Sequence, residues 1–270
     1  MNMNRGSFFL GMIFVVFGGL LLLDNFAILR FNVWKLFWPM LVIVLGVWIL
    51  WQSQYGDKVL ESESVTIDLE GASEGRISLH HGAGELRVAA GTSETELLSG
   101  TFDGGIDQSS KRVADRLEAK IKVSSQGFPF AFAPWIWGPG NRIRWDLAIN
   151  PSVPLSLEVH SGANDARLDL SETNVTNLEI HTGASATEVH LPAQVEHTRV
   201  KVEAGAASVK LIVPEGVAAR IDVSGGLIGV DVDQMRFPKQ GKVYCSPEFE
   251  SAPYRVEIKV EAGVGSISVN

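Results

Sequence analysis

Hydrophobic and polar residues alternate in short runs over the last 200 or so residues of the chain. The run "LEIHTGASATEVHLP", residues 178 to 192, is representative: the alternation that includes Ile180 stops at Gly183 and resumes through Val189 and Leu191. A period of two is typical of a β-strand with one buried face, and β-branched residues favour strands. The run therefore predicts two strands joined by a turn at Gly183.

Similar runs begin at residues 77, 157, 178, 200, 221 and 258, and each has a glycine at the same place. These glycines are Gly82, Gly162, Gly183, Gly205, Gly226 and Gly263. Four of them follow one another at intervals of 21, 22 and 21 residues, which indicates stacked repeats. One repeat cannot cover its own inner face and needs a neighbour about 4.8 Å away. The pattern predicts a mainly β fold, a β-solenoid with one repeat per rung and a sharp turn at each glycine, where a positive φ would favour that residue.

Residues 57–150 are less regular. Strands are predicted within 65–71, 77–91, 96–102, 116–125 and 142–151, and a loop is predicted over 102–115. The stretch "FPFAFAPWIWGPG", residues 128–140, is rich in aromatic residues and proline. Its side chains could contact the membrane interface or a partner, or they could cap the open end of the solenoid, which we favour. The residues concerned are Phe130, Phe132, Trp135 and Trp137.

Two uncharged runs, residues 8–23 and 36–51, precede this region, and each has 16 residues. With their flanks they approach the length of a membrane-spanning helix, and tryptophans lie towards both ends of the second run. We predict a transmembrane helical hairpin over residues 1–52. Two spans place the rest of the chain on the same side of the membrane as the N-terminus, and the basic residues do not decide which side that is.

After residue 51 the chain carries 20 basic and 30 acidic residues, a net charge of −10. This charge argues against binding nucleic acid through the general field of the domain. Cys245 is the only cysteine, so no disulfide can form within the chain. No P-loop, dinucleotide fingerprint or zinc-protease motif is present, and we predict neither a catalytic residue nor a cofactor.

Stacking the repeats also aligns polar residues. The positions two before each glycine are His80, His160, His181, Glu203, Ser224 and Glu261. His160, His181 and Glu203 would lie on adjacent rungs and could ligate a divalent metal ion, but groups in a line favour a solvated polar ladder instead. A second column would alternate in charge from Glu179 through Lys201 to Asp222.

Three segments together resemble known bacterial families. "GGLLLLDNF" (18–26) and "FWPMLVIVLGVWIL" (37–50) resemble the transmembrane region of LiaI-LiaF-like membrane proteins. Residues 144–192 resemble the toast-rack β-repeat domain, and "ISLHHGAGELRV" with "ELLSGTF" is similar to its N-terminal part. The resemblance implies a transmembrane hairpin, an N-terminal toast-rack region over 53–150 and a toast-rack repeat domain over 151–270.

The same resemblance implies a non-enzymatic, multi-pass protein of the cell membrane. LiaF-like members regulate envelope-stress signalling through partner membrane proteins, so a scaffold or regulator is expected here. Other toast-rack domains are described as adhesins, and a surface-exposed ligand-binding module is the alternative. The expected partners are the lipid bilayer and other membrane proteins; a homo-oligomer is possible and nucleic acid is not expected.

Overall fold

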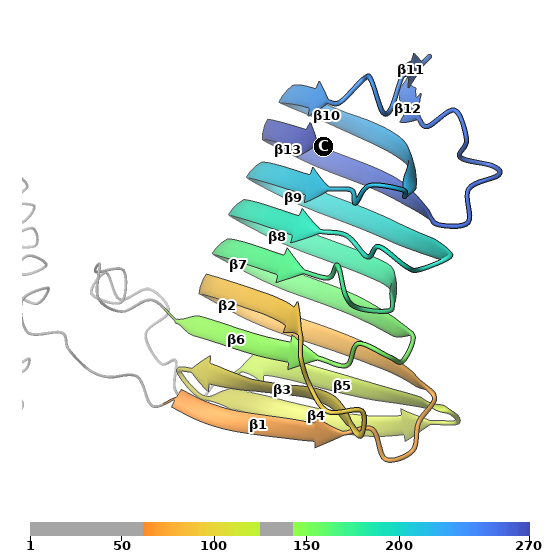
Figure 1. Cartoon of the computed structure of the whole chain (residues 1–270). Coiled ribbons are helices and arrows are strands. Elements are labelled where there is room, and N and C mark those ends of the chain that lie inside the picture. Colours follow the sequence, from red (N-terminus) through yellow and green to blue (C-terminus); the bar gives the residue numbers. More distant parts are fainter. Residues whose placement is uncertain (1–61, 125–142) are drawn as a thin grey trace, which may run out of the picture. The chain divides into compact units, whose positions relative to one another are not determined.

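The computed structural model describes residues 62–124 and 143–270, where the chain forms one sheet of thirteen strands (Figure 1). The strands are β1 (Ser62–Asp68), β2 (Glu74–Ala90), β3 (Glu96–Asp103), β4 (Ile106–Val113), β5 (Arg116–Val123), β6 (Arg144–Ile149), β7 (Leu155–Asp169), β8 (Val175–His190), β9 (His197–Ile212), β10 (Ala218–Val232), β11 (Lys239–Gln240), β12 (Val243–Cys245) and β13 (Arg255–Val269). These two ranges contain no helix with the length and hydrophobicity needed to cross a membrane. The predicted hairpin, residues 1–52, and the aromatic stretch, residues 128–140, lie outside the described residues.

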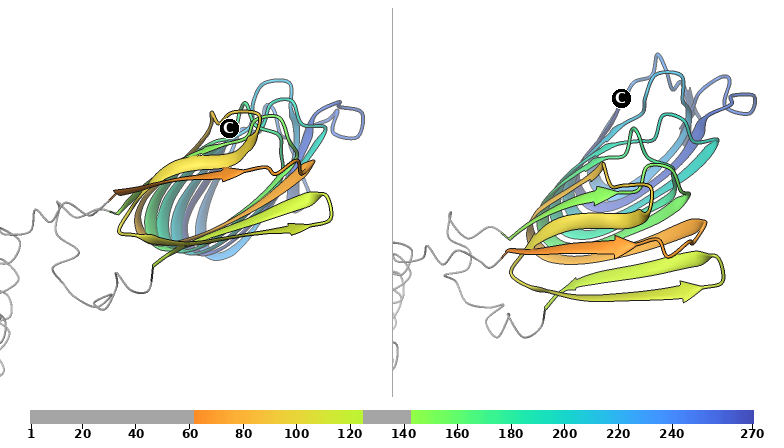
Figure 2. Two further views of the ribbon diagram at one scale, coloured as in Figure 1. Left: turned by 90° about the horizontal axis from the view of Figure 1, so that it is seen from below. Right: turned by 60° about the horizontal axis from the view of Figure 1, so that its bottom comes forward.

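Six long strands form the rungs of a β-solenoid, as predicted. β2, β7, β8, β9, β13 and β10 lie side by side, parallel and in register, and each folds back on itself once (Figure 1). The view from below shows the two arms of each rung facing one another across the interior (Figure 2). Each rung hydrogen-bonds to its neighbours, so the stack supplies both the backbone pairing and the core.

The burial pattern locates the bend within each rung. In β7 the buried hydrophobic side chains are Leu155, Leu157 and Val159 before Gly162, and Ala166 and Leu168 after it. The buried positions change from odd to even numbers because the chain turns there while remaining one continuous strand. The prediction of two separate strands joined by a turn is therefore wrong in this respect: the glycine bends a strand and does not end it.

The reason for glycine at the bend also differs from the prediction. None of the six repeat glycines has a positive φ. A Cβ placed on Gly183 would lie 2.7 Å from the carbonyl oxygen of Gly162, and one on Gly205 would lie 2.7 Å from that of Gly183. Real Cβ atoms do not approach an oxygen so closely. Glycine is required because the bends of neighbouring rungs stack in backbone contact, so a methyl group has no room.

The rungs do not stack in the order of the sequence. β13, the last strand of the chain, lies between β9 and β10. The chain can skip a rung because residues 233–254 form a long connection that pairs β12 with the first arm of β10 before it returns. The predicted alternation is therefore right for Glu179 and Lys201, which lie opposite one another on neighbouring rungs, but wrong for the step from Lys201 to Asp222. Lys259 lies between Lys201 and Asp222, and Lys201 instead forms an ion pair of 2.5 Å with Glu203 of its own rung.

The other end of the stack is built from shorter strands. β5 and β4 extend the first arm beyond β2, whereas β6, β3 and β1 extend the second. Trp145 and Phe102 fill the interior there, with ring centroids 5.2 Å apart. β4 lies in the segment predicted to be a loop, so that prediction is wrong there. The strand was not recognised because its side chains are almost all exposed and show no alternation. Residues 62–124 and 143–270 belong to one compact unit.

We predict that Gly183→Ala destabilises the protein by about 1 to 3 kcal/mol, because the new methyl group forces two rungs apart. Gly82→Ala is the matched control: it occupies the same repeat position on β2, but no atom lies within 4 Å of a Cβ built there. Denaturant unfolding of the full-length protein in detergent measures both variants. Equal stability of the two would contradict the close-approach explanation.

Candidate functional site

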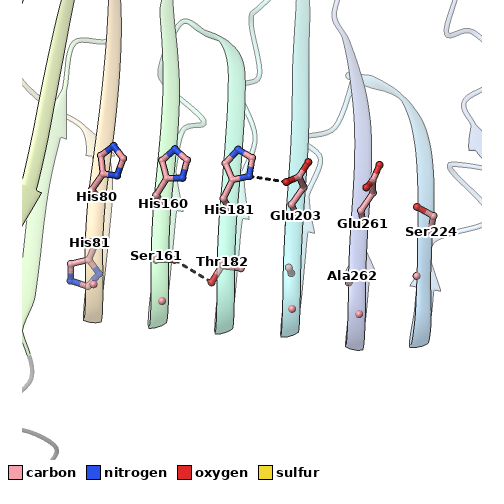
Figure 3. A pocket seen from close by; sticks show the side chains of 16 residues that line it. His80, His81, His160, Ser161, His181, Thr182, Glu203, Ser224, Glu261 and Ala262 are labelled. Atoms are coloured by element: carbon pink, nitrogen blue, oxygen red, sulfur yellow. Dashed lines mark hydrogen bonds and ion pairs between the residues drawn. The ribbon is translucent and has the colours of Figure 1, made fainter. Parts of the chain in front are cut away.

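One column of outward-facing side chains lies beside the bend of every rung (Figure 3). Each member precedes its repeat glycine by two positions, and strand pairing places the six in a row across the stack. In spatial order they are His80, His160, His181, Glu203, Glu261 and Ser224. We call this row the imidazole–carboxylate ladder. Sequence analysis found all six members but placed Ser224 before Glu261, because it followed the order of the chain.

The three histidines of the ladder form a continuous stack. The ring centroids of His80 and His160 are 4.6 Å apart, those of His160 and His181 are 4.7 Å apart, and both interplanar angles are 8°. This spacing is the distance between neighbouring strands of a sheet. The rings therefore stack face to face because the rungs are in register, and their nitrogen-bearing edges point away from the strands (Figure 3).

Carboxylates hold the second and third rings. Glu158 Oε1 is 2.6 Å from His160 Nε2, and Glu203 Oε2 is 2.9 Å from His181 Nδ1. The hydrogen bond with His160 lowers the pKa of Glu158, and Arg76 on β2 adds to this effect. Hydrogen bonds from Lys201 and then His181 lower the pKa of Glu203. These carboxylates therefore stay ionised beside the rings.

The first ring has a different environment. Partial burial lowers the pKa of His80, and the positive charges of Lys120 and Lys122 on β5 lower it further, as does the neighbouring His160. The ladder is consequently graded along the stack. An imidazole with a lowered pKa lies at the β2 end, carboxylate-paired imidazoles lie in the middle, and two carboxylates lie on β9 and β13.

The ladder does not form a metal centre in this arrangement. Because the rings of His160 and His181 are stacked and nearly parallel, their nitrogens lie side by side and do not surround a common point. Within residues 62–124 and 143–270, no three histidine, cysteine, aspartate or glutamate side chains converge on a position that could hold a metal ion. The structure lends no support to a shared metal on His160, His181 and Glu203.

An open groove follows the ladder across all six rungs. Its volume is about 870 Å³. The ladder side chains line it together with the residues that follow them, which are small except at β2 and include Ser161, Thr182, Ala204 and Ala262. A hydrogen bond of 3.1 Å from Ser161 Oγ to Thr182 Oγ1 joins two of these rungs. The groove thus offers polar groups at one-rung intervals on a rigid support, which suits an extended ligand or a segment of another protein.

His81 is the exception beside the groove, and sequence analysis did not single it out. Its side chain is 1% exposed and packs against Trp145, with ring centroids 4.9 Å apart. Burial lowers the pKa of His81 to about 4, although the backbone of Ile143 opposes the shift. Its place in the alternation, two residues after the buried Leu79, was the signal that could have identified it as inward-facing.

The other predicted contact residues are not located by the structure. Phe130, Phe132, Trp135 and Trp137 belong to residues 125–142, outside the described part of the chain. Whether they contact a membrane or partner, or cap the solenoid, stays a prediction.

Comparison with known proteins places the chain in a family. The family model described as the N-terminal domain of toast_rack, DUF2154, matches residues 55–212, which is more than half of the chain. The chain belongs to the toast-rack family. The matched segment includes β1 to β9, and β13 and β10 continue the same toast-rack register beyond it.

A second family model, the LiaI-LiaF-like transmembrane region, matches residues 8–50. The combination indicates a toast-rack protein of the bacterial envelope that resides in a membrane. No curated protein matches the chain.

Two solved structures are similar to this toast-rack protein. The first, a "putative cell adhesion protein" from Clostridium sporogenes, is 18% identical with a TM-score of 0.69, over 78% of this chain and 98% of that one. At this identity it shows a common fold. The second, a "putative adhesin" from Bacteroides fragilis, is 8% identical with a TM-score of 0.30, over 79% of this chain and 98% of that one. This score is too low to show a common fold.

We predict that the toast-rack domain loses stability as the pH falls from 6.5 towards 4. His81 is neutral when folded, with a pKa of about 4, but takes up a proton near pH 6.5 when unfolded. Below pH 6.5 the unfolded state therefore binds more protons, and the loss reaches up to about 3 kcal/mol. His81→Phe should flatten this part of the profile in denaturant unfolding at several pH values.

The control for this measurement is His190→Gln, since His190 is exposed on the outer face of β8. This variant should keep the acid-dependent loss of the parent protein. An equally steep loss in His81→Phe would show that His81 is not its source.

Proposed function

We propose that this toast-rack protein is a non-enzymatic, multi-pass membrane protein that serves as a scaffold or regulator in envelope-stress signalling. Its hairpin anchors the chain, and the imidazole–carboxylate ladder forms the docking surface for a partner membrane protein. The observation that carries the proposal is the groove along the ladder, because it runs across every rung and is joined in one chain to a LiaI-LiaF-like transmembrane region.

The chemistry of the ladder supports recognition over catalysis. Its carboxylates are engaged by neighbouring cations and imidazoles: Lys201 binds Glu203 at 2.5 Å, and Lys259 binds Glu261 at 2.7 Å. Such groups present fixed charges and hydrogen-bonding edges to a partner. Because the groove is open to solvent, it favours contact with a protein segment over enclosure of a small substrate.

The proposal is tested in cells of the source bacterium with a reporter of an envelope-stress promoter. Deletion of the gene should change the reporter's response to envelope damage, and the wild-type chain should restore it. A variant with His181→Ala and Glu203→Ala should restore it poorly, since it removes the hydrogen-bonded pair at the middle of the ladder.

A matched control lies on the same rung. Glu188 and His190 form a similar pair on the other arm of β8, 3.7 Å apart and away from the groove. The variant with Glu188→Ala and His190→Ala should restore the response fully. An unchanged response after deletion of the gene would refute the signalling role, whereas equal complementation by both double variants would refute the ladder as the docking surface.

The alternative function is a surface-exposed module that binds a ligand or another cell. The same groove would serve it, and the fold of the Clostridium sporogenes protein, named for cell adhesion, is consistent with it. A reporter fused after Asn270 distinguishes the two functions. A cytoplasmic reporter excludes the adhesin-like function, because the domain could then reach no extracellular ligand.

A further inference from the structure

The two arms of the solenoid end differently at β10. The first arm continues beyond it, since Arg220, Ile221 and Asp222 pair with β12 and β12 pairs with β11. The second arm stops at β10. In the described part of the chain, no strand pairs with the outer edge of residues 224–232. That segment leaves a free edge beside the core of the stack.

Val230 at this edge is exposed although its counterparts in other rungs are buried. Val230 is 39% exposed, whereas Val209 and Ile267 at the same position of β9 and β13 are each 1% exposed. Leu227 is 78% exposed at the bend of β10. Among the described residues five large hydrophobic side chains are exposed, and four of them lie at this end: Leu227, Val230, Met235 and Val264. A patch of this kind beside an unpaired edge is typical of an interface.

The free edges at the opposite end have the polar character that prevents pairing. β4, at the edge of the first arm, reads "IDQSSKRV" and exposes Lys111 and Arg112. β1, at the edge of the second arm, reads "SESVTID". Proteins commonly protect sheet edges with such charged and polar residues. By contrast, residues 224–232 of β10, "SGGLIGVDV", contain one charged residue, Asp231.

We propose that the second arm of β10 pairs with the same arm of a second copy of this chain, in an antiparallel, two-fold symmetric dimer. The pairing would continue the second-arm sheet from one solenoid into the other and bury Leu227 and Val230 of both copies. The proposal is independent of what the imidazole–carboxylate ladder binds.

One end of the solenoid has an apolar free edge and the other end has polar free edges. This difference favours a second copy bound in the head-to-head orientation. A head-to-tail contact would place the apolar edge of β10 against the polar edge of β1 or β4, and it would repeat without closing. A two-fold contact places apolar edge against apolar edge and closes after two copies. With the axis through Gly229, Val230 faces Ile228 of the other copy and Asp231 faces Leu227, so that paired side chains lie on the same face of the sheet. No like charges are then opposed.

Cross-linking of the full-length protein in its native membrane tests the dimer. In a Cys245→Ser background, a single cysteine is introduced by Leu227→Cys, Ile228→Cys, Gly229→Cys or Val230→Cys, and a short bis-maleimide reagent is added. Because a two-fold axis brings each residue near it close to its own copy, we expect dimers at these positions with a maximum at Gly229. Ser109→Cys, on the exposed edge of β4, is the control and should yield several-fold less dimer.

A second variant tests whether the apolar edge drives association. Val230→Lys should favour the monomer by about tenfold or more, because pairing would bury an unpaired ammonium group. Sedimentation of the detergent-solubilised protein measures this shift, and circular dichroism verifies that the sheet is retained. Three cross-linking results would overturn the proposal: dimers at Ser109 as abundant as at Gly229, no dimer at any β10 position, or cross-links only to a different protein. An unshifted monomer–dimer equilibrium in folded Val230→Lys would also overturn it.

Discussion

In-register stacking of the rungs, with backbone in contact at the bends, is the constraint on which the rest of this structure depends. At five of the six repeat glycines, a Cβ atom would lie 2.6 to 2.9 Å from the carbonyl oxygen of the repeat glycine in a neighbouring rung. The close approach keeps equivalent residues of neighbouring rungs opposite one another. Aliphatic side chains then form continuous columns inside, and polar side chains form continuous columns outside. The core and the candidate site are consequences of the same register.

The ladder owes its chemistry to that register. The 4.7 Å between the rings of His160 and His181 is the strand spacing itself, so two imidazoles stack without any special local structure. The hydrogen bond between His181 and Glu203 likewise joins two adjacent rungs. A short repeat thus displays a graded row of imidazoles and carboxylates on a rigid support. This suits a toast-rack protein of the envelope whose proposed task is recognition.

Features that repeat along the chain could be predicted from it. The period of two and the recurring glycine predicted the rungs, their inward side chains and the six members of the ladder. The position of β13 could not be predicted, because it depends on how a connection of more than twenty residues returns to the stack. The role of Gly183 was misjudged for another reason: a positive φ and a close backbone approach both select glycine, and sequence does not separate them. β4 was missed because a strand exposed on both faces has no alternation.

The spatial order of the rungs is tested directly by disulfide formation in a Cys245→Ser background. Ser208 of β9 pairs with Ser266 of β13, and their Oγ atoms are 3.1 Å apart. The pair Ser208→Cys and Ser266→Cys should therefore form a disulfide within one chain on mild oxidation. The pair Ser208→Cys and Gly229→Cys should not, since β13 separates β9 from β10. The reverse result would mean that the rungs follow the order of the sequence and that Glu261 does not stand beside Glu203 in the ladder.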